Sequence, residues 1–162
     1  MTSFEQLRAH VKPQDRVVMT NASNISIRST PQQTVDYKPN GLWYGIGTSW
    51  IDWVSFEMPS WKGKNLYKLT LSTSQMLILS TSKALKEFTL KYGKALHDFD
   101  KEHKLKYLAI DWSTVSKTYG GIEIRPYQPA ARHAYIWYYP WDVASGCVWN
   151  KSVIQRITKI EL

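Results

Sequence analysis

The sequence is poor in cysteine and has no long apolar run. Cys147 is the only cysteine among 162 residues, which excludes an intrachain disulfide and a cysteine-rich zinc site. No stretch approaches the ~20 apolar residues that a membrane-spanning helix needs. The first fifteen residues also lack the apolar centre of a signal peptide. We therefore expect a cytoplasmic protein that does not enter a membrane.

Several well-known catalytic and nucleotide-binding motifs are missing as well. The glycines of "GLWYGIGTSW" (41–50) match neither G-x-G-x-x-G nor the phosphate-binding loop G-x-x-x-x-G-K-[ST]. A serine-hydrolase motif G-x-S-x-G is absent. The four histidines show no metalloprotease spacing, and we expect no metal site.

Positive charge and aromatic side chains are plentiful. Lysine and arginine number 21 against 13 aspartate and glutamate, which gives a net charge of +8. Such a field favours polyanions, nucleic acid above all, although a basic surface that only aids solubility is the alternative. Eight tryptophans and ten tyrosines provide core material and possible walls for a pocket that binds flat rings.

The hydrophobic pattern predicts one α+β domain over residues 1–162. Helical spacing marks short helices, and alternation or short apolar runs mark strands. The order of these segments shows no regular βαβα rhythm, so we expect two mostly antiparallel sheets with short flanking helices. The helices are expected in segments 3–11, 48–58, 81–93 and 111–121, with Ser82 as the cap of the third. The strands are expected at 15–20, 24–29, 41–47, 65–72, 75–80, 122–127, 146–149 and 153–162.

One acidic residue lies inside an apolar strand. In "TYGGIEIRPY" (118–127), Glu123 stands between Ile122 and Ile124. Alternation puts the two isoleucines on one face and Glu123 on the other. Glu123 is either the outward residue of an edge strand or a pocket carboxylate that binds a sugar hydroxyl and stabilises a developing cation. The spacing leaves both interpretations open.

Three further positions have two interpretations each. Arg28, with Ser29 beside it, is either solvated or a planar fork for a diphosphate. Trp43 and Tyr44 are adjacent, so they face opposite sides of their strand and one of them belongs to the core. The other is free to stack on a flat ring. Cys147 is expected to be a buried, inert thiol.

Taken in order, these segments resemble the ADP-ribosyltransferase superfamily, in its compact form from bacterial and phage toxins and defence proteins. The resemblance covers roughly residues 16–150 and rests on segment order more than on any single motif. Its segments are an arginine-bearing first strand, "GLWYGIGTSW", the strand pair "YKLTLS" and "MLILS", a helix carrying Leu-x-x-Phe, and the Tyr-Gly-Gly-Ile-Glu-Ile strand.

The resemblance implies a NAD cleft between the sheets, with NAD as co-substrate. Arg28 would contact the NAD phosphates or ribose, with Arg16 and Asn21 as competing candidates. Tyr44 or Trp43 would stack on nicotinamide. The hydroxyl residues Thr48 and Ser49 would support the site.

Glu123 takes the role of the catalytic glutamate in this resemblance. It would bind the ribose hydroxyl and stabilise the oxocarbenium-like transition state as nicotinamide leaves. Gly121 occupies the position two residues earlier, where members that modify arginine carry glutamate, so an arginine acceptor is not expected.

The implied function is a toxin or defence effector that modifies a macromolecule. The basic charge favours RNA or DNA as acceptor, with protein as an alternative and an antitoxin as a possible partner. A NAD glycohydrolase on the same fold is a second hypothesis. A non-enzymatic nucleic-acid-binding module, which would combine lysines with aromatic stacking, is a third.

Overall fold

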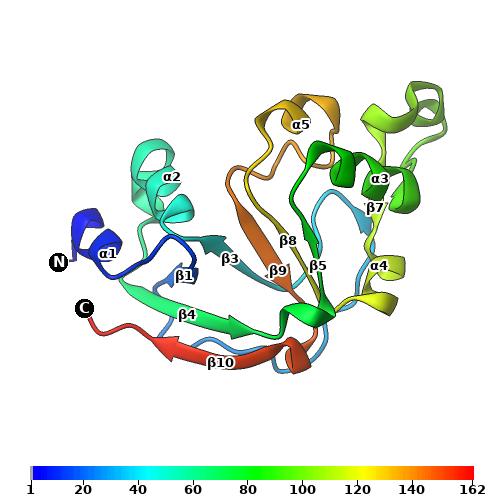
Figure 1. Ribbon diagram of the computed structural model, residues 1–162. Helices are drawn as coiled ribbons and strands as arrows, with labels where there is room; N and C mark the ends of the chain where they lie inside the picture. The colour runs from blue at the N-terminus through cyan, green and yellow to red at the C-terminus, as the bar shows by residue number, and fades with distance from the viewer. Residues whose placement is uncertain (1) are drawn as a thin grey trace.

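The computed structural model describes residues 2–162, with the backbone alone for residues 99–103. The α-helices and strands follow one another in a mixed order along the chain (Figure 1). The helices are α1 (Phe4–Ala9), α2 (Ser49–Glu57), α3 (Ser82–Tyr92), α4 (Trp112–Thr118) and α5 (Pro129–Ala134). The strands are β1 (Arg16–Thr20), β2 (Val35–Asp36), β3 (Leu42–Ile46), β4 (Asn65–Leu71), β5 (Met76–Leu79), β6 (Gly93–Lys94), β7 (Ala109–Asp111), β8 (Gly121–Ile124), β9 (Ser145–Val148) and β10 (Ile154–Lys159).

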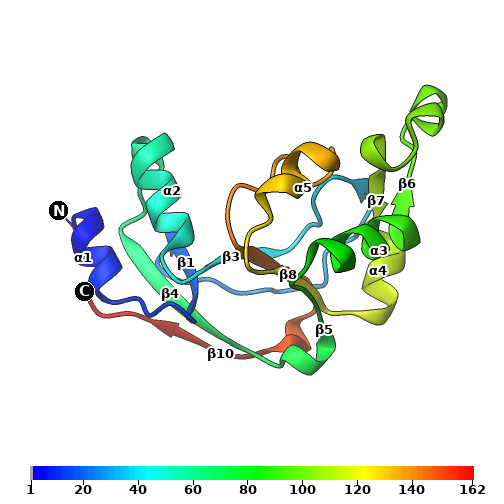
Figure 2. The ribbon, with the colours of Figure 1, turned by 45° about the horizontal axis from the view of Figure 1, so that its top comes forward.

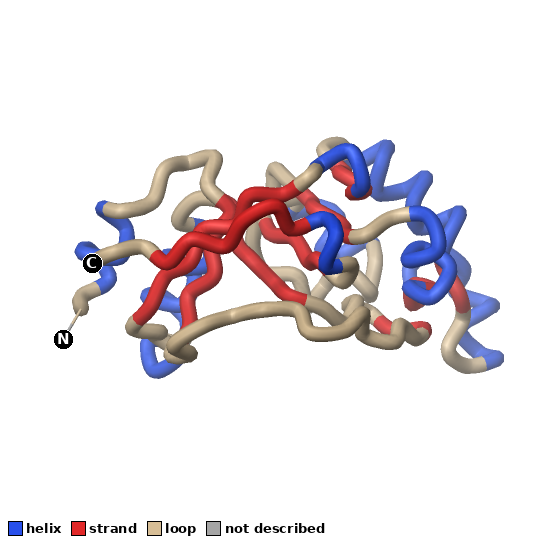
Figure 3. The backbone as a smooth tube through the Cα atoms, turned by 90° about the horizontal axis from the view of Figure 1, so that it is seen from below, coloured by secondary structure: helices blue, strands red, loops and turns tan. Residues whose placement is uncertain are grey.

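A seven-stranded sheet in the order β10-β4-β1-β3-β9-β8-β5 forms the body of the protein. Its pairs are antiparallel except for β5 and β8, which run parallel. Met76 of β5 and Ile157 of β10, at opposite edges, belong to one apolar cluster. The sheet is therefore curled, and this cluster fills its concave face (Figures 1 and 3).

The pairing between β1 and β3 is short. These strands are in register only at Arg16↔Ile46 and Val17↔Gly45. Beyond that point β1 stays paired with β4 through Thr20, and β3 stays paired with β9 through Leu42. The sheet therefore splits between β1 and β3 toward the ends that carry Thr20 and Leu42.

The opposite face of the sheet packs against an aromatic core under α3, α4 and α5 (Figure 2). Ile122 and Ile124 of β8 enter this core, as the alternation of their strand predicts. A small sheet in the order β2-β7-β6 lies beside it. The buried tryptophans of this core are Trp112, Trp137, Trp141 and Trp149.

A strand expected at 24–29 is not formed. Residues 21–34 contain no strand, and Ile25 and Ile27 pack from this segment onto the concave cluster. A long loop passes beneath the strands (Figure 3). The alternation of apolar and polar residues predicts a strand, but it comes from a loop whose isoleucines pack onto the sheet.

Most other expected elements are present. Ser3 and Gln6 form a capping box at the start of α1. The helix at 82–92 is capped by Thr81, whose side chain accepts from the Ala84 amide, and not by Ser82 as expected. Residues 129–134, which the sequence left unassigned, form α5 with Pro129 in its first turn.

The described residues form one α+β domain, as the sequence predicts. Among them, two mostly antiparallel sheets are present, as expected, one of seven strands and one of three. The NAD cleft that the resemblance implies between them stays a prediction. Over residues 2–162, the structure has no helix that is both long and apolar enough to cross a bilayer.

Candidate functional site

Glu123 lies on the concave face of the curled sheet. In β8 it is in register with Gly146 of β9, and Gly146 is in register with Tyr44 of β3. Residues in register share a face, so Glu123 and Tyr44 lie on the same side. The side chain of Glu123 is fully buried, with an exposed fraction of 0%.

Three polar side chains surround the buried carboxylate. The Nε of Arg16 donates to Oε1 at 2.6 Å, and its second nitrogen Nη2 donates to Oε2 at 3.3 Å. The hydroxyl of Tyr44 donates to Oε1 at 2.7 Å. The Nε of Arg125 lies 2.9 Å from Oε2. A carboxylate removed from water needs such partners, and here two guanidiniums and one phenol supply them.

The curl of the sheet is what brings Arg16 to Glu123. Strands β3 and β9 separate β1 from β8. In a flat sheet β1 and β8 would be roughly 14 Å apart, which is farther than an arginine side chain reaches. The contact therefore depends on curvature, and it raises the pKa of Arg16, chiefly through its hydrogen bond to Glu123.

Tyr44 holds the carboxylate from the centre of the sheet. Burial, followed by the negative charge of Glu123, raises the pKa of the Tyr44 phenol well above its ordinary value, so the hydroxyl remains a donor. Gly146 leaves the space that this ring occupies, because a Cβ there would collide with Cζ and Oη of Tyr44. The pair Tyr44 and Gly146 thus fixes where the phenol points.

The arginine expected at this position, Arg28, lies elsewhere. Arg28 and Ser29 are exposed in the loop before β2 and line a shallow depression beside Gly41 and Leu42. That is the opposite end of β3 from Ile46, which is in register with Arg16. Of the competing candidates, Asn21 accepts a hydrogen bond from the Lys64 amide, and only Arg16 reaches Glu123.

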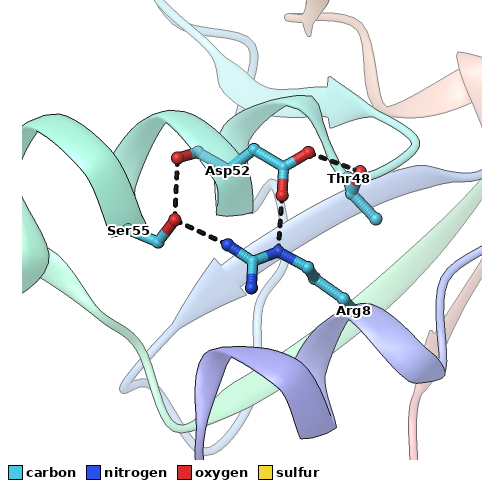
Figure 4. A network of polar contacts seen from close by, with 4 residues as sticks. All are labelled: Arg8, Thr48, Asp52 and Ser55. Atoms are coloured by element: carbon cyan, nitrogen blue, oxygen red, sulfur yellow. Dashed lines mark hydrogen bonds and ion pairs between the residues drawn. The ribbon is translucent and has the colours of Figure 1, made fainter.

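Thr48 and Ser49 lie at the start of α2, and their hydroxyls are used for structural hydrogen bonds. The Thr48 hydroxyl donates to Asp52 at 2.7 Å, and Asp52 accepts from Nε of Arg8 at 2.6 Å (Figure 4). The Ser49 hydroxyl donates to the carbonyl of Ala144 at 2.9 Å, which ties α2 to the segment before β9. Neither hydroxyl contacts Glu123.

A second feature, a hollow of about 300 Å³, opens at the split between β1 and β3. Its walls include Trp43, Trp50 and Trp141, and two charged residues, Lys38 and Asp142, also line it. Trp43 packs edge-on against Trp141 with ring centroids 4.9 Å apart. We refer to this hollow as the tryptophan pocket.

The structure separates the two aromatic neighbours of β3. Tyr44 is buried and donates to Glu123 on the concave side, whereas the half-buried Trp43 packs toward the aromatic core on the other face of β3. Both residues line the tryptophan pocket, but Glu123 is not among its lining residues.

Sequence reasoning missed three residues of these sites. Arg125 directly follows the β8 strand, and its position two residues after Glu123 puts it on the same face, a signal that the alternation contains. Lys38 and Trp141 reach the tryptophan pocket from loops, and no local pattern in the sequence marks them.

Comparisons of the chain with models of protein families, with curated proteins and with solved structures find no match.

Proposed function

We propose that this chain is an NAD-dependent ADP-ribosyltransferase that acts through Glu123. The observation that supports this is the direct contact of three side chains from three separate segments. These are Arg16 of the first strand, Tyr44 of the Gly-Leu-Trp-Tyr strand and Glu123 of the Tyr-Gly-Gly-Ile-Glu-Ile strand. The resemblance implies Glu123 as the catalytic residue and includes Tyr44 and Arg16 among its alternatives, although its first choice for the arginine is Arg28.

The proposed chemistry needs a negative charge beside the ribose of NAD. As the bond between C1′ of the ribose and the nicotinamide nitrogen breaks, its electron pair leaves with nicotinamide and positive charge develops on the sugar. A fixed carboxylate stabilises that charge in the transition state. The acceptor then forms a bond to C1′ through an oxygen or nitrogen and loses a proton.

Access to Glu123 requires a rearrangement, because the carboxylate is buried in this structure. Its two arginine partners differ in exposure, with 38% for the side chain of Arg125 and 16% for that of Arg16. The diphosphate of NAD carries negative charge that competes with Glu123 for both guanidiniums. We propose that Arg125 moves first, binds the diphosphate and leaves one carboxylate oxygen free for the ribose.

The acceptor in this proposal is a nucleic acid, with protein as the alternative. The net charge of +8 supports a polyanion. The chain would then act as a toxin or defence effector, with an antitoxin as partner. If water took the place of the acceptor, the same site would act as an NAD glycohydrolase.

An exposed aromatic cluster favours a second candidate function, binding of single-stranded nucleic acid without catalysis. Trp50 and Trp53 stack with centroids 4.9 Å apart, and Trp61, which is 56% exposed, lies 5.9 Å from Trp53. Bases stack on such surfaces in proteins that bind single strands. This function predicts binding that weakens steeply with salt and does not depend on Glu123.

Labelled NAD tests these functions directly. The protein is incubated with labelled NAD and cell lysate, and the products are divided by nuclease and protease treatment. Label in a nuclease-sensitive or protease-sensitive product supports transfer, and free ADP-ribose alone supports a glycohydrolase. Unchanged NAD in every fraction would contradict both enzymatic functions and leave the binding function to be tested by its salt dependence.

A further inference from the structure

The tryptophan pocket contains a cation, Lys38, that has no ion-pair partner among the described residues. Over the described residues, Lys38 makes no ion pair and no hydrogen bond, and its Nζ lies 4.9 Å from the centre of the Trp43 ring. The nearest acidic side chain of the pocket, Asp142, is paired with Arg132 at 3.6 Å. Lys38 therefore reaches the hollow with a ring face beside it and with Asp142 near enough to act on its charge but not as an ion-pair partner.

Burial makes this arrangement costly for the free protein. Burial lowers the pKa of Lys38, although the negative charge of Asp142 opposes that effect. A half-buried ammonium gains stability from any acceptor that replaces the water it has lost. A ligand with a negative oxygen in the pocket would supply such an acceptor.

The walls of the pocket select for a flat ring. Trp43 and Trp141 meet with an angle of 73° between their planes, and both indoles line the hollow, so a ligand there has aromatic surface on more than one side. Trp50 contributes a third indole at the entrance from α2. Aromatic rings stack on such surfaces with an energy beyond that of their buried area alone.

We propose that the tryptophan pocket is a binding site for a planar aromatic carboxylate. The ring lies between the tryptophans, and the carboxylate binds Nζ of Lys38. The proposal does not depend on NAD chemistry, because Glu123 is not among the residues that line the pocket.

Charge and size distinguish a carboxylate from other anions. A phosphate group carries up to two negative charges, whereas among the described residues Lys38 is the one cation that lines the pocket, and the acidic Asp142 lines it too. A volume of about 300 Å³ suits one or two fused rings. It lies at the lower end of the roughly 300–1,000 Å³ common for ligand pockets, so a whole dinucleotide would not fit inside.

Three small probes of equal size test the proposal. Benzoate has both the flat ring and the charge, benzamide has the ring without the charge, and cyclohexanecarboxylate has the charge without the flat ring. Calorimetric titration is expected to show saturable binding of benzoate and at least about tenfold weaker binding of the other two, as expected for losing a charged hydrogen bond or a ring stack. No benzoate binding, or equal binding of all three, would overturn the proposal.

Lys38→Met removes the charge and keeps the length of the side chain. We expect it to weaken benzoate binding at least about tenfold. Lys91→Met is the matched control, since Lys91 also lies over an aromatic ring, 5.3 Å from the centre of Tyr92, but away from the pocket. Equal losses in both variants, or unchanged binding in Lys38→Met, would contradict the assignment.

A measurement on the wild-type protein keeps the test independent of how the variants fold. Benzoate is added stepwise while nuclear magnetic resonance records the signals of the indole N–H groups. Binding is expected to change the chemical shifts of Trp43 and Trp141. The buried indoles of Trp112 and Trp149, which do not line the pocket, are expected to stay in place. Shifts confined to the second pair would place the ligand elsewhere and overturn the proposal.

Discussion

Arg16 and Glu123 are 107 residues apart in the chain, and they meet at 2.6 Å between Nε and Oε1 across two intervening strands. The contact lies inside the curl of the sheet, where Glu123 has no exposed surface. The contact between Arg16 and Glu123 therefore forms only when the whole sheet is folded and curled. Loss of the carboxylate leaves the charge of Arg16 without its partner, and loss of Arg16 leaves the buried carboxylate with Arg125 and Tyr44 alone.

The first prediction concerns the stability of this pair. Glu123→Met leaves both Arg16 and Arg125 without the carboxylate and is expected to lower the free energy of unfolding by about 3–5 kcal/mol. Urea denaturation measures this change. Adding Arg16→Met to the same chain is expected to recover part of the loss, because one uncompensated charge is then removed. A double variant no more stable than the single one would contradict this account of the pair.

The second prediction concerns the space that Gly146 leaves for the Tyr44 ring. In Gly146→Ala the new methyl group collides with the ring, which cannot move without losing its hydrogen bond to Glu123. We expect a loss of stability of about 1–3 kcal/mol, measured by thermal or urea unfolding. In a Tyr44→Leu background the same substitution should cost less, because the shorter side chain removes the collision with the ring, although the carbonyl oxygen of Ile122 would still lie 2.8 Å from the new methyl group. Equal costs in the two backgrounds would show that the ring is not the cause.

The third prediction concerns acid stability through Asp111. Although burial alone would raise it, hydrogen bonds from Thr114 and the nearby Lys94 hold the pKa of Asp111 below its ordinary value of 3.8. A carboxyl group whose pKa is lowered in the folded state contributes its full stabilisation at pH values above its ordinary pKa. This contribution is lost as the pH falls through the lowered pKa. Asp111→Ala, which also removes the cap of α4, should cost about 1 kcal/mol at neutral pH and less at lower pH.

Glu87→Ala is the control for the acid series. Glu87 is on the exposed side of α3 and pairs with Lys83 at 3.7 Å, so we expect a change within about 0.5 kcal/mol. A cost for Asp111→Ala that stays constant from neutral pH to well below 3.8 would contradict the role of its charge.

The fourth prediction separates the arginines. If Arg16 and Arg125 pass from Glu123 to the diphosphate of NAD, Arg125→Met should weaken the binding of ADP-ribose by about tenfold or more. Arg28→Met should change it little, because Arg28 lies at the far end of β3. Calorimetry with ADP-ribose gives both values. If Arg28→Met weakened ADP-ribose binding more than Arg125→Met, Arg28 and not Arg125 would bind the diphosphate.

Much of the fold was predictable because its elements carry local signals. Alternation places Ile122 and Ile124 in the aromatic core, and a capping box starts α1. The choice between Arg16 and Arg28 was not predictable, because each lies beside a short apolar segment that could be a strand, and only the pairing with distant strands separates them. Ile25 and Ile27 imitate a strand while lying on the sheet from a loop.

The tryptophan pocket was also outside the reach of local patterns. It exists because β1 and β3 separate after Val17 and Gly45, and register between distant strands is not written in either strand alone. The sequence did indicate that Trp43 and Tyr44 divide between core and a free face. It did not indicate that the free ring, Trp43, would lie on the side away from Glu123.

Release of nicotinamide from NAD, measured side by side for the wild-type protein and Glu123→Gln, tests the proposed function most directly. Circular dichroism and unfolding curves must first show that both proteins are folded under the assay conditions. The account predicts release by the wild type and a loss of about two orders of magnitude or more in the variant, as expected when a transition-state stabiliser is removed. Equal release by both proteins, or none by a folded wild type with acceptor present, would contradict it.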